Sequence, residues 1–157
     1  MSPVDRAEQD LGMLLAACCE RIVRNLLGEL STVGYGHLTP SQSLTMLFIG
    51  DGLDTVTQLA DRLGMTTQAI SKICATLHAG GLLERQAAVA DGRVRHLQLT
   101  AEGRRAVDAM RTAGVAVEQA WVDLVGADTL GVVRTALAAF AFAPETATTS
   151  PVHIRFA

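Results

Sequence analysis

Apolar residues recur at steps of three and four along the first long segment of the chain, from about Asp5 to Leu30. Glycines at 34 and 36 then interrupt the pattern. This spacing predicts one amphipathic helix whose apolar face needs a partner to cover it. The residues of that face are Leu11, Leu14, Leu15, Cys18, Ile22, Leu26 and Leu30.

The second predicted helix is marked by a start signal at residues 39–42. Thr39 is a good N-cap, Pro40 suits the first helical position, and Gln42 stands where the partner of a capping box belongs. This helix is expected to run through Phe48 and to end at the turn of residues 50–52.

Two further short helices follow closely. Thr55 and Gln58 form another capping box, and Gly64 stops the helix that it opens. Thr66 opens the next helix, which ends at Gly80-Gly81. Two short helices joined by a tight glycine-containing turn indicate a helix-turn-helix. The inward face of the second of these helices is predicted to hold Ile70, Ile73 and Leu77.

After Gly81 the pattern changes from a helical to a strand period. Residues 82–86 and 94–99 are predicted strands, and in the second one Leu97 and Leu99 alternate with polar residues. Asp91-Gly92 between them is a strong signal for a hairpin turn. A hairpin directly behind a helix-turn-helix predicts a winged helix, with the wing at about residues 82–99.

The remaining chain predicts two helices and a tail. Thr100 is expected to cap a long helix that ends at Gly126. Asp128 is expected to cap the last helix. From Pro144 onward the composition is that of a flexible tail. The apolar side of the long helix is predicted to hold Val107, Met110, Val115, Val117, Trp121 and Leu124. The stripe of the last helix is predicted to hold Leu130, Val133, Leu137 and Phe140.

Composition narrows the class of protein. The chain has 157 residues, of which 49% are apolar and 18% charged, and this excludes a disordered chain. No apolar run is long enough to span a bilayer, and the first residues are polar and acidic, unlike a secretion signal. Three cysteines, two of them adjacent, form no disulfide framework. We therefore expect a cytoplasmic protein without a membrane partner.

Charge and side-chain chemistry point to DNA. Residues 55–100 hold five basic and three acidic residues, although the net charge of the chain is −3. Hydroxyls suit phosphates, glutamine suits adenine, and lysine suits guanine or phosphate. The predicted recognition helix carries this set in Thr66, Thr67, Gln68, Ser71 and Lys72. An ordinary solvated helix face is the alternative interpretation.

The predicted tip of the hairpin carries a second set of charged residues. Arg93 and Arg95 lie beside the turn, and Asp91 is close enough to pair with Arg93. Arginine suits insertion into a narrow minor groove. A surface salt bridge, which contributes at most about 1 kcal/mol, is the alternative.

The ordered series of motifs resembles the MarR family of bacterial transcriptional regulators, over about residues 10–142. The motifs that carry this resemblance are Leu38-Thr39-Pro40-Ser41-Gln42, Gln58-Leu59-Ala60-Asp61-Arg62-Leu63-Gly64, Ala69-Ile70-Ser71-Lys72, Gly81-Leu82-Leu83-Glu84-Arg85, Asp91-Gly92-Arg93 and Leu99-Thr100-Ala101-Glu102-Gly103. The resemblance implies a homodimer whose two recognition helices enter successive major grooves of a double-stranded, pseudo-palindromic operator. The half-sites are then about 34 Å apart. It also implies that Arg93 enters the minor groove while Asp91 orients it.

The predicted fold class is therefore mainly α with a small β-hairpin wing, a winged helix-turn-helix plus a helical dimerisation layer. We assign residues 5–36 to an N-terminal dimerisation helix, 37–100 to the winged DNA-binding domain, 101–142 to C-terminal dimerisation helices and 143–157 to the tail. The wing departs from the family pattern, because Gly92 stands where a second basic residue is common and residues 87–90 are apolar. We expect weaker phosphate contacts and unusual sensitivity to salt.

The resemblance also implies a switch. Many members release DNA when a small aromatic or amphipathic ligand enters the crevice beside the dimerisation layer. Arg85 aligns with a position near such ligands in some members, although a structural or phosphate-facing role is at least as compatible. Tyr35, His37 and Trp121 are further candidates for a pocket, but lone aromatic residues at such spacings more often belong to the core. Some members sense peroxides through a cysteine of the first helix, where this chain has Cys18 and Cys19.

A structural role is favoured for these cysteines, because Cys18 lies on the apolar stripe of its helix. In addition, the peroxide-sensing members pair their cysteine with several tyrosines, and this chain has only Tyr35. No cofactor is implied, and the four histidines lack metal-ligand spacing. We predict a homodimeric DNA-binding regulator, a repressor released by a small ligand. The alternatives are a thiol-based oxidative-stress sensor and a winged-helix interaction module without DNA binding. An enzyme is not expected, because no base stands near either cysteine.

Overall fold

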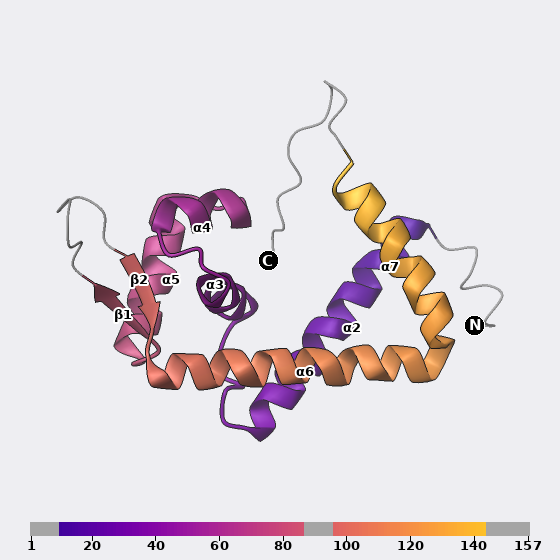
Figure 1. The fold of residues 1–157 in the computed structure, drawn as a ribbon, viewed down its shortest axis with the longest axis horizontal. Helices are drawn as coiled ribbons and strands as arrows, with labels where there is room; N and C mark the ends of the chain where they lie inside the picture. The colour runs from indigo at the N-terminus through magenta and orange to yellow at the C-terminus, as the bar shows by residue number, and fades with distance from the viewer. Residues whose placement is uncertain (1–9, 87–95, 144–157) are drawn as a thin grey trace.

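The computed structural model describes residues 10–86 and 96–143. These residues form six helices and one two-stranded antiparallel sheet (Figure 1). The order of elements is α2 (Leu11–Thr32), α3 (Pro40–Gly50), α4 (Val56–Leu63), α5 (Thr67–Ala79), β1 (Leu83–Gln86), β2 (His96–Leu99), α6 (Ala101–Val125) and α7 (Ala127–Ala141). This confirms the mainly helical class with a small two-stranded wing.

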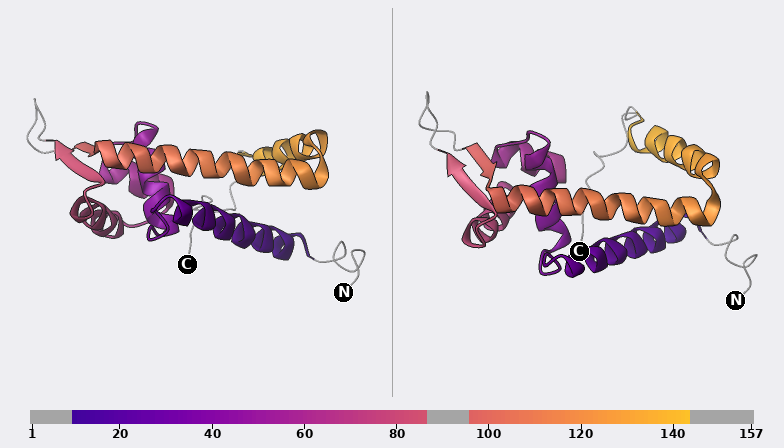
Figure 2. Two further views of the ribbon diagram at one scale, coloured as in Figure 1. Left: turned by 90° about the horizontal axis from the view of Figure 1, so that it is seen from below. Right: turned by 60° about the horizontal axis from the view of Figure 1, so that its bottom comes forward.

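The molecule has two parts. Helices α3 to α5 and the two strands gather at one end and form the winged unit, while α6 runs from this unit to the opposite end (Figure 1). There α7 turns back, and α2 packs along α6 in both further views (Figure 2). We refer to α2, α6 and α7 together as the arms.

Helix α2 begins later and ends later than the apolar pattern predicts. The Asp10 carboxylate caps it by accepting hydrogen bonds from the amides of Gly12 at 2.9 Å and Met13 at 3.3 Å. The helix ends at Thr32, two residues beyond Leu30. The expected start at Asp5 lies outside the described residues.

The predicted capping boxes of α3 and α4 are confirmed. The Thr39 hydroxyl accepts from the Gln42 amide at 3.3 Å, and the Gln42 side chain accepts from the Thr39 amide at 2.9 Å. Thr55 and Gln58 repeat this arrangement at 3.3 and 3.1 Å. Each box satisfies amides that the first helical turn leaves without a partner, so the caps define where both helices begin.

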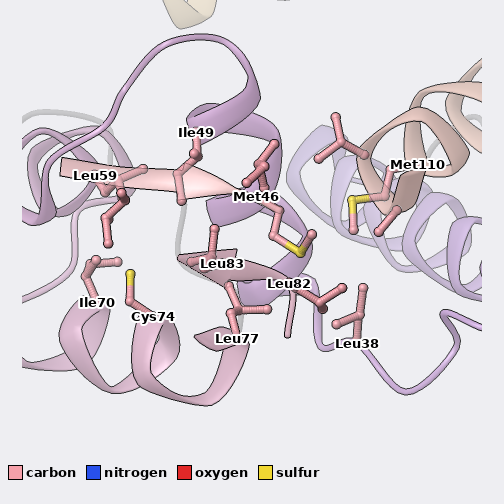
Figure 3. Close-up of a cluster of buried hydrophobic side chains, with 14 of the residues drawn as sticks. Leu38, Met46, Ile49, Leu59, Ile70, Cys74, Leu77, Leu82, Leu83 and Met110 are labelled. Carbon is pink, nitrogen blue, oxygen red and sulfur yellow. The ribbon is translucent and has the colours of Figure 1, made fainter. Parts of the chain in front are cut away.

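A single core holds the winged unit together (Figure 3). Ile70 and Leu77 are buried as predicted, whereas Ile73 is only partly buried and Cys74 takes the central position between them. The spacing of three and four residues from 70 to 74 to 77 explains this exchange. The largest fully buried side chains of the chain include Met46, Leu59, Ile70, Leu77 and Leu83.

The wing begins as a short antiparallel ladder. Leu83 pairs with Leu99 and Arg85 pairs with Leu97, and both Leu97 and Leu99 are buried as predicted. The predicted turn and the first two residues of the expected second strand lie within residues 87–95, outside the described residues.

Two expectations for the arms are wrong. Val115 and Leu124 do not lie on the buried side of α6, because they are 70% and 69% exposed and the buried positions follow the helical step from Ala106 to Met110, Ala113 and Val117. Asp128 does not cap α7. Gly126, with a φ of +85°, occupies the N-cap position without a side-chain hydrogen bond, and Asp128 lies in the first turn. A carboxylate in the first turn still interacts favourably with the positive end of the helix dipole.

Helices α2 and α7 remain largely uncovered in the single chain. Only Leu30 is buried in α2 and only Leu130 in α7, and Phe140 is 84% exposed. Among the described helices none is by itself both long and apolar enough to cross a membrane. Helices α6 and α7 pass that test only as a pair, by length and composition, and the chain bends by 116° between them.

Candidate nucleic-acid interface

Helix α5 presents the five polar residues that the sequence singles out for DNA. Thr66, Thr67, Gln68, Ser71 and Lys72 are all exposed, and the buried positions of the helix are Ile70, Cys74 and Leu77. Thr66 is the N-cap, and its hydroxyl accepts from the Ala69 amide at 3.2 Å. The structure thus brings these side chains together at the start and on the outer side of one helix.

The turn between α4 and α5 sets the position of that helix. Gly64 adopts a left-handed conformation with a φ of +62°, which glycine tolerates without steric cost. The Met65 amide then donates to the Ala60 carbonyl at 3.0 Å. The Arg62 guanidinium lies 5.2 Å from the centre of the Phe48 ring, a cation–π contact between α4 and α3.

Asp54 connects the base of the wing to the start of the helix-turn-helix through hydrogen bonds. The Leu97 amide donates to the Asp54 carbonyl at 2.7 Å, and His96 Nδ1 lies 2.8 Å from the Asp54 carboxylate. Asp54 could not be identified from the sequence, because its partners are more than 40 residues away and no local pattern marks the pair. The predicted minor-groove residues Asp91, Arg93 and Arg95 lie outside the described residues.

Thr100 connects the wing to α6. Its hydroxyl donates to the Gly81 carbonyl at 2.7 Å and accepts from the Gly103 amide at 3.0 Å, while its own amide donates to the Leu82 carbonyl at 3.1 Å. A side chain at Gly103 would overlap the Leu82 carbonyl oxygen. The threonine and the glycine of this motif therefore hold the first turn of α6 against the end of α5 and the start of β1.

Tyr35 joins the corner between α2 and α3 to the same turn of α6. Its hydroxyl donates to Glu102 at 2.6 Å, and Arg105 pairs with the same carboxylate. The hydrogen bond from Tyr35, together with Arg105, holds the pKa of Glu102 below its ordinary value. The same hydrogen bond raises the pKa of Tyr35, because it favours the protonated phenol, and burial adds to this effect. The cluster links the arms to the winged unit.

An apolar pocket of about 320 Å³ lies between the arms and α3. We call it the apolar pocket; residues from α2, α3, α6 and α7 line it, among them Leu26, Leu44, Leu47, Met110 and Trp121. Cys18 and Cys19, which are free thiols, also line it. The structure therefore places both redox candidates beside a cavity.

Of the residues predicted to contribute to a ligand pocket, Trp121 lines the apolar pocket, whereas Tyr35 and His37 do not. Neither Tyr35, which bonds to Glu102, nor His37, whose Nδ1 lies 3.2 Å from the Gly34 carbonyl, lines the apolar pocket. The backbone of Arg85 lies in β1, and its side chain is outside the described part of the structure. Within residues 10–86 and 96–143, no three His, Cys, Asp or Glu side chains form a group that could hold a metal ion.

A polar helix behind a tight turn, followed by a two-stranded wing, defines a winged helix-turn-helix protein. Residues 38–94 match the MarR family, and this range covers the helix-turn-helix and most of the wing. Over this winged unit the chain is similar to the MarR family of winged-helix transcriptional regulators.

One relative is a transcriptional activator. The exopolysaccharide II synthesis transcriptional activator ExpG of Rhizobium meliloti is 29% identical over 127 residues, which are 76% of this chain and 66% of that protein. The chain therefore spans slightly less than two thirds of that relative's length.

Two solved structures share the fold. Streptococcus pneumoniae FabT in complex with DNA has a TM-score of 0.71 and 21% identity, with 83% of this chain and 92% of that one covered. CouR from Rhodococcus jostii, bound to p-coumaroyl-CoA, has a TM-score of 0.68 and 18% identity, with 88% and 96% covered.

Proposed function

We propose that the chain is a cytoplasmic homodimer that binds a pseudo-palindromic DNA operator and represses transcription until a small ligand releases it. The exposed polar face of α5 is the observation that carries the proposal. Thr67, Gln68, Ser71 and Lys72 offer a donor and acceptor set that suits phosphates and base edges. We assign Asp91, Arg93 and Arg95 to the wing contact with the minor groove, on the sequence alone.

A second copy of the chain is proposed to cover the arms. Large apolar side chains that monomers rarely leave in water are exposed there. They are Leu11, Met13, Leu15, Val115, Leu124, Val125, Val132, Leu137 and Phe140, together with Phe142 directly after α7. Obligate dimer interfaces resemble a core cut in half, and the arms have this character.

The DNA-bound structure of FabT shows that this fold takes a nucleic-acid ligand in another protein.

Fluorescence anisotropy tests DNA binding. The full chain is titrated onto DNA from upstream of its own gene and onto scrambled DNA at several salt concentrations. Lys72→Ala is expected to weaken binding about 10-fold and to reduce the salt slope by about one ion. Arg21→Ala removes an exposed cation from α2 and serves as the matched control.

The outcomes of that titration separate the candidate functions. Tight, salt-dependent binding that Lys72→Ala weakens and Arg21→Ala does not would support the proposal. If neither this DNA nor a selection from the whole genome binds, the interaction-module alternative replaces it.

The direction of regulation has two candidates. Repression is our proposal, and activation is favoured by one observation, because ExpG is a transcriptional activator. Transcription in vitro from the bound promoter distinguishes them. A transcript that falls when the protein is added indicates a repressor, and one that rises indicates an activator.

Release by a ligand is proposed to act through the apolar pocket. Its wall combines side chains of the arms with α3 of the winged unit, so a bound molecule contacts both parts and can change their relative position. CouR, which is bound to p-coumaroyl-CoA, shows that a relative of this fold takes a small molecule.

The thiol-sensor alternative uses the same place, because Cys18 and Cys19 line it. Peroxide that releases DNA from the wild type but not from the double variant Cys18→Ser/Cys19→Ser would support that alternative. Release that is equal in both proteins would exclude it.

A further inference from the structure

The apolar pocket has a wall of uniform chemistry. Among its lining residues from the described part of the chain, none is charged, and nearly all are aliphatic, thiol or aromatic. An ion that enters such a cavity loses its hydration without gaining a partner charge. The wall therefore discriminates against any ligand with an ionised group inside the pocket.

One hydroxyl group interrupts this wall. The Ser43 hydroxyl on α3 is buried and has no hydrogen-bond partner among the described residues. A buried hydroxyl without a partner is unfavourable, and in native proteins such a group usually has a reason. Ser43 lies one turn inside α3, so a ligand group bonded to it would bind directly to the first helix of the winged unit.

We propose that the apolar pocket binds an uncharged amphiphile, an aliphatic chain with a single neutral hydroxyl or carbonyl group that hydrogen-bonds to Ser43. This rests on the proposed ligand-released regulator and narrows the ligand class. Leu15 and Leu137 line the pocket and also belong to the surface proposed for the second copy, so the test below includes the second copy as an outcome. Acids such as aromatic carboxylates, and amines, are rejected by the absence of a partner charge. A cavity of about 320 Å³ holds a short chain.

Trp121 provides the readout. It lines the pocket, and it is the only tryptophan of the chain, so its emission reports on occupancy without a label. The full-length protein is titrated with 1-octanol below its solubility limit, and with octanoate and octylamine below their micellar concentrations, all at neutral pH. These probes share one chain length and differ in the charge of the head group.

The expected result is a saturable change in Trp121 emission with 1-octanol and at least 10-fold weaker effects of octanoate and octylamine. Ser43→Ala removes only the hydroxyl and is expected to weaken 1-octanol binding about 3- to 10-fold. Ser31→Ala on α2, outside the pocket wall, is the matched control and is expected to leave the affinity unchanged.

Three results would overturn the proposal. The first is equal binding of all three probes, and the second is an affinity for 1-octanol that Ser43→Ala does not change. The third is emission that responds to dilution of the protein but not to 1-octanol, which would mean that the second copy fills the pocket.

DNA anisotropy on the same samples distinguishes a failure of the proposed ligand class from a failure of the proposed DNA-binding function. Intact DNA binding without an effect of 1-octanol on Trp121 rejects the ligand class and leaves the regulator standing. A saturable, Ser43-dependent octanol signal in a protein that binds no DNA supports the pocket and rejects the operator function.

Discussion

Gly103 illustrates how one residue determines the approach of two segments. Its missing side chain leaves room for the Leu82 carbonyl oxygen, which accepts from the Thr100 amide at 3.1 Å. The close approach brings the first turn of α6 onto the start of the wing. A glycine at this position is therefore explained by the space it leaves, and not by its backbone conformation.

Gly103→Ala is expected to lower the free energy of unfolding by about 2 kcal/mol, because the added methyl group overlaps backbone that cannot move away cheaply. Urea denaturation followed by circular dichroism measures this change. Gly28→Ala in α2 is the matched control, because nothing lies within 4 Å of the new methyl group. It is expected to stabilise the protein by about 0.5–1 kcal/mol. Equal effects of both substitutions would contradict the account.

The cluster of Tyr35, Glu102 and Arg105 predicts a dependence on pH. A carboxyl group whose pKa is lowered by folding stabilises the protein above its unfolded pKa, and this contribution is lost as the pH falls through its folded pKa. Tyr35→Phe removes the first cause of the lowered pKa. The pKa of Glu102, measured by NMR titration of its carboxyl carbon, should therefore rise toward the ordinary value of 4.5.

The same substitution should lower the Tm by about 2–4 °C at neutral pH, the size expected for the loss of one hydrogen bond in a chain of this length. The difference in Tm should shrink in acid, once Glu102 is protonated in both proteins. An unchanged Glu102 pKa in Tyr35→Phe, with the fold intact by circular dichroism, would show that the hydrogen bond does not hold in solution.

At the scale of elements, α4 depends on its cap. Thr55→Ala removes the hydroxyl that accepts from the Gln58 amide, and it is expected to destabilise the protein by about 1 kcal/mol. Thr57→Ala is the matched control, because Thr57 is exposed inside the same helix. Denaturation midpoints measure both variants, and a loss of stability in Thr57→Ala as large as that in Thr55→Ala would argue against a capping effect.

Elements with local signals were predictable from the sequence, and contacts between distant segments were not. The boxes at Thr39 and Thr55 lie within four residues, so the sequence alone located α3 and α4. The contact from Tyr35 to Glu102 spans 67 positions and that from His96 to Asp54 spans 42, and neither leaves a local pattern.

The arms were the hardest part to predict for a related reason. Apolar periodicity shows which residues avoid water in the complete assembly, but not which of them the chain buries by itself. Val115 and Leu124 were assigned to the buried side of α6, yet they remain exposed in the single chain. For the candidate site, the composition of α5 was sufficient to select its exposed residues, whereas the pocket lined by Cys18 and Ser43 required four helices to come together.

At the scale of the whole molecule, the exposed apolar surface of the arms predicts a dimer. Phe140→Asp places a charge on the most exposed large apolar side chain of α7 and is expected to convert the protein to monomers of 16.6 kDa. Sedimentation equilibrium measures the mass. Val33→Asp is the control and should leave the dimer intact, because Val33 is an exposed apolar residue at the C-terminal end of α2, beside the winged unit. A dimer that withstands Phe140→Asp would place the interface elsewhere.

The central claim is that two copies of α5 read one operator. Hydroxyl-radical footprinting on a fragment selected from the genome by the full-length protein tests it most directly. We expect two protected patches on one face of the DNA, with centres about 34 Å apart, one helical turn. Lys72→Ala should weaken both patches together. A single protected patch, or protection without preference for any fragment, would contradict the claim that this chain is a dimeric operator-binding regulator.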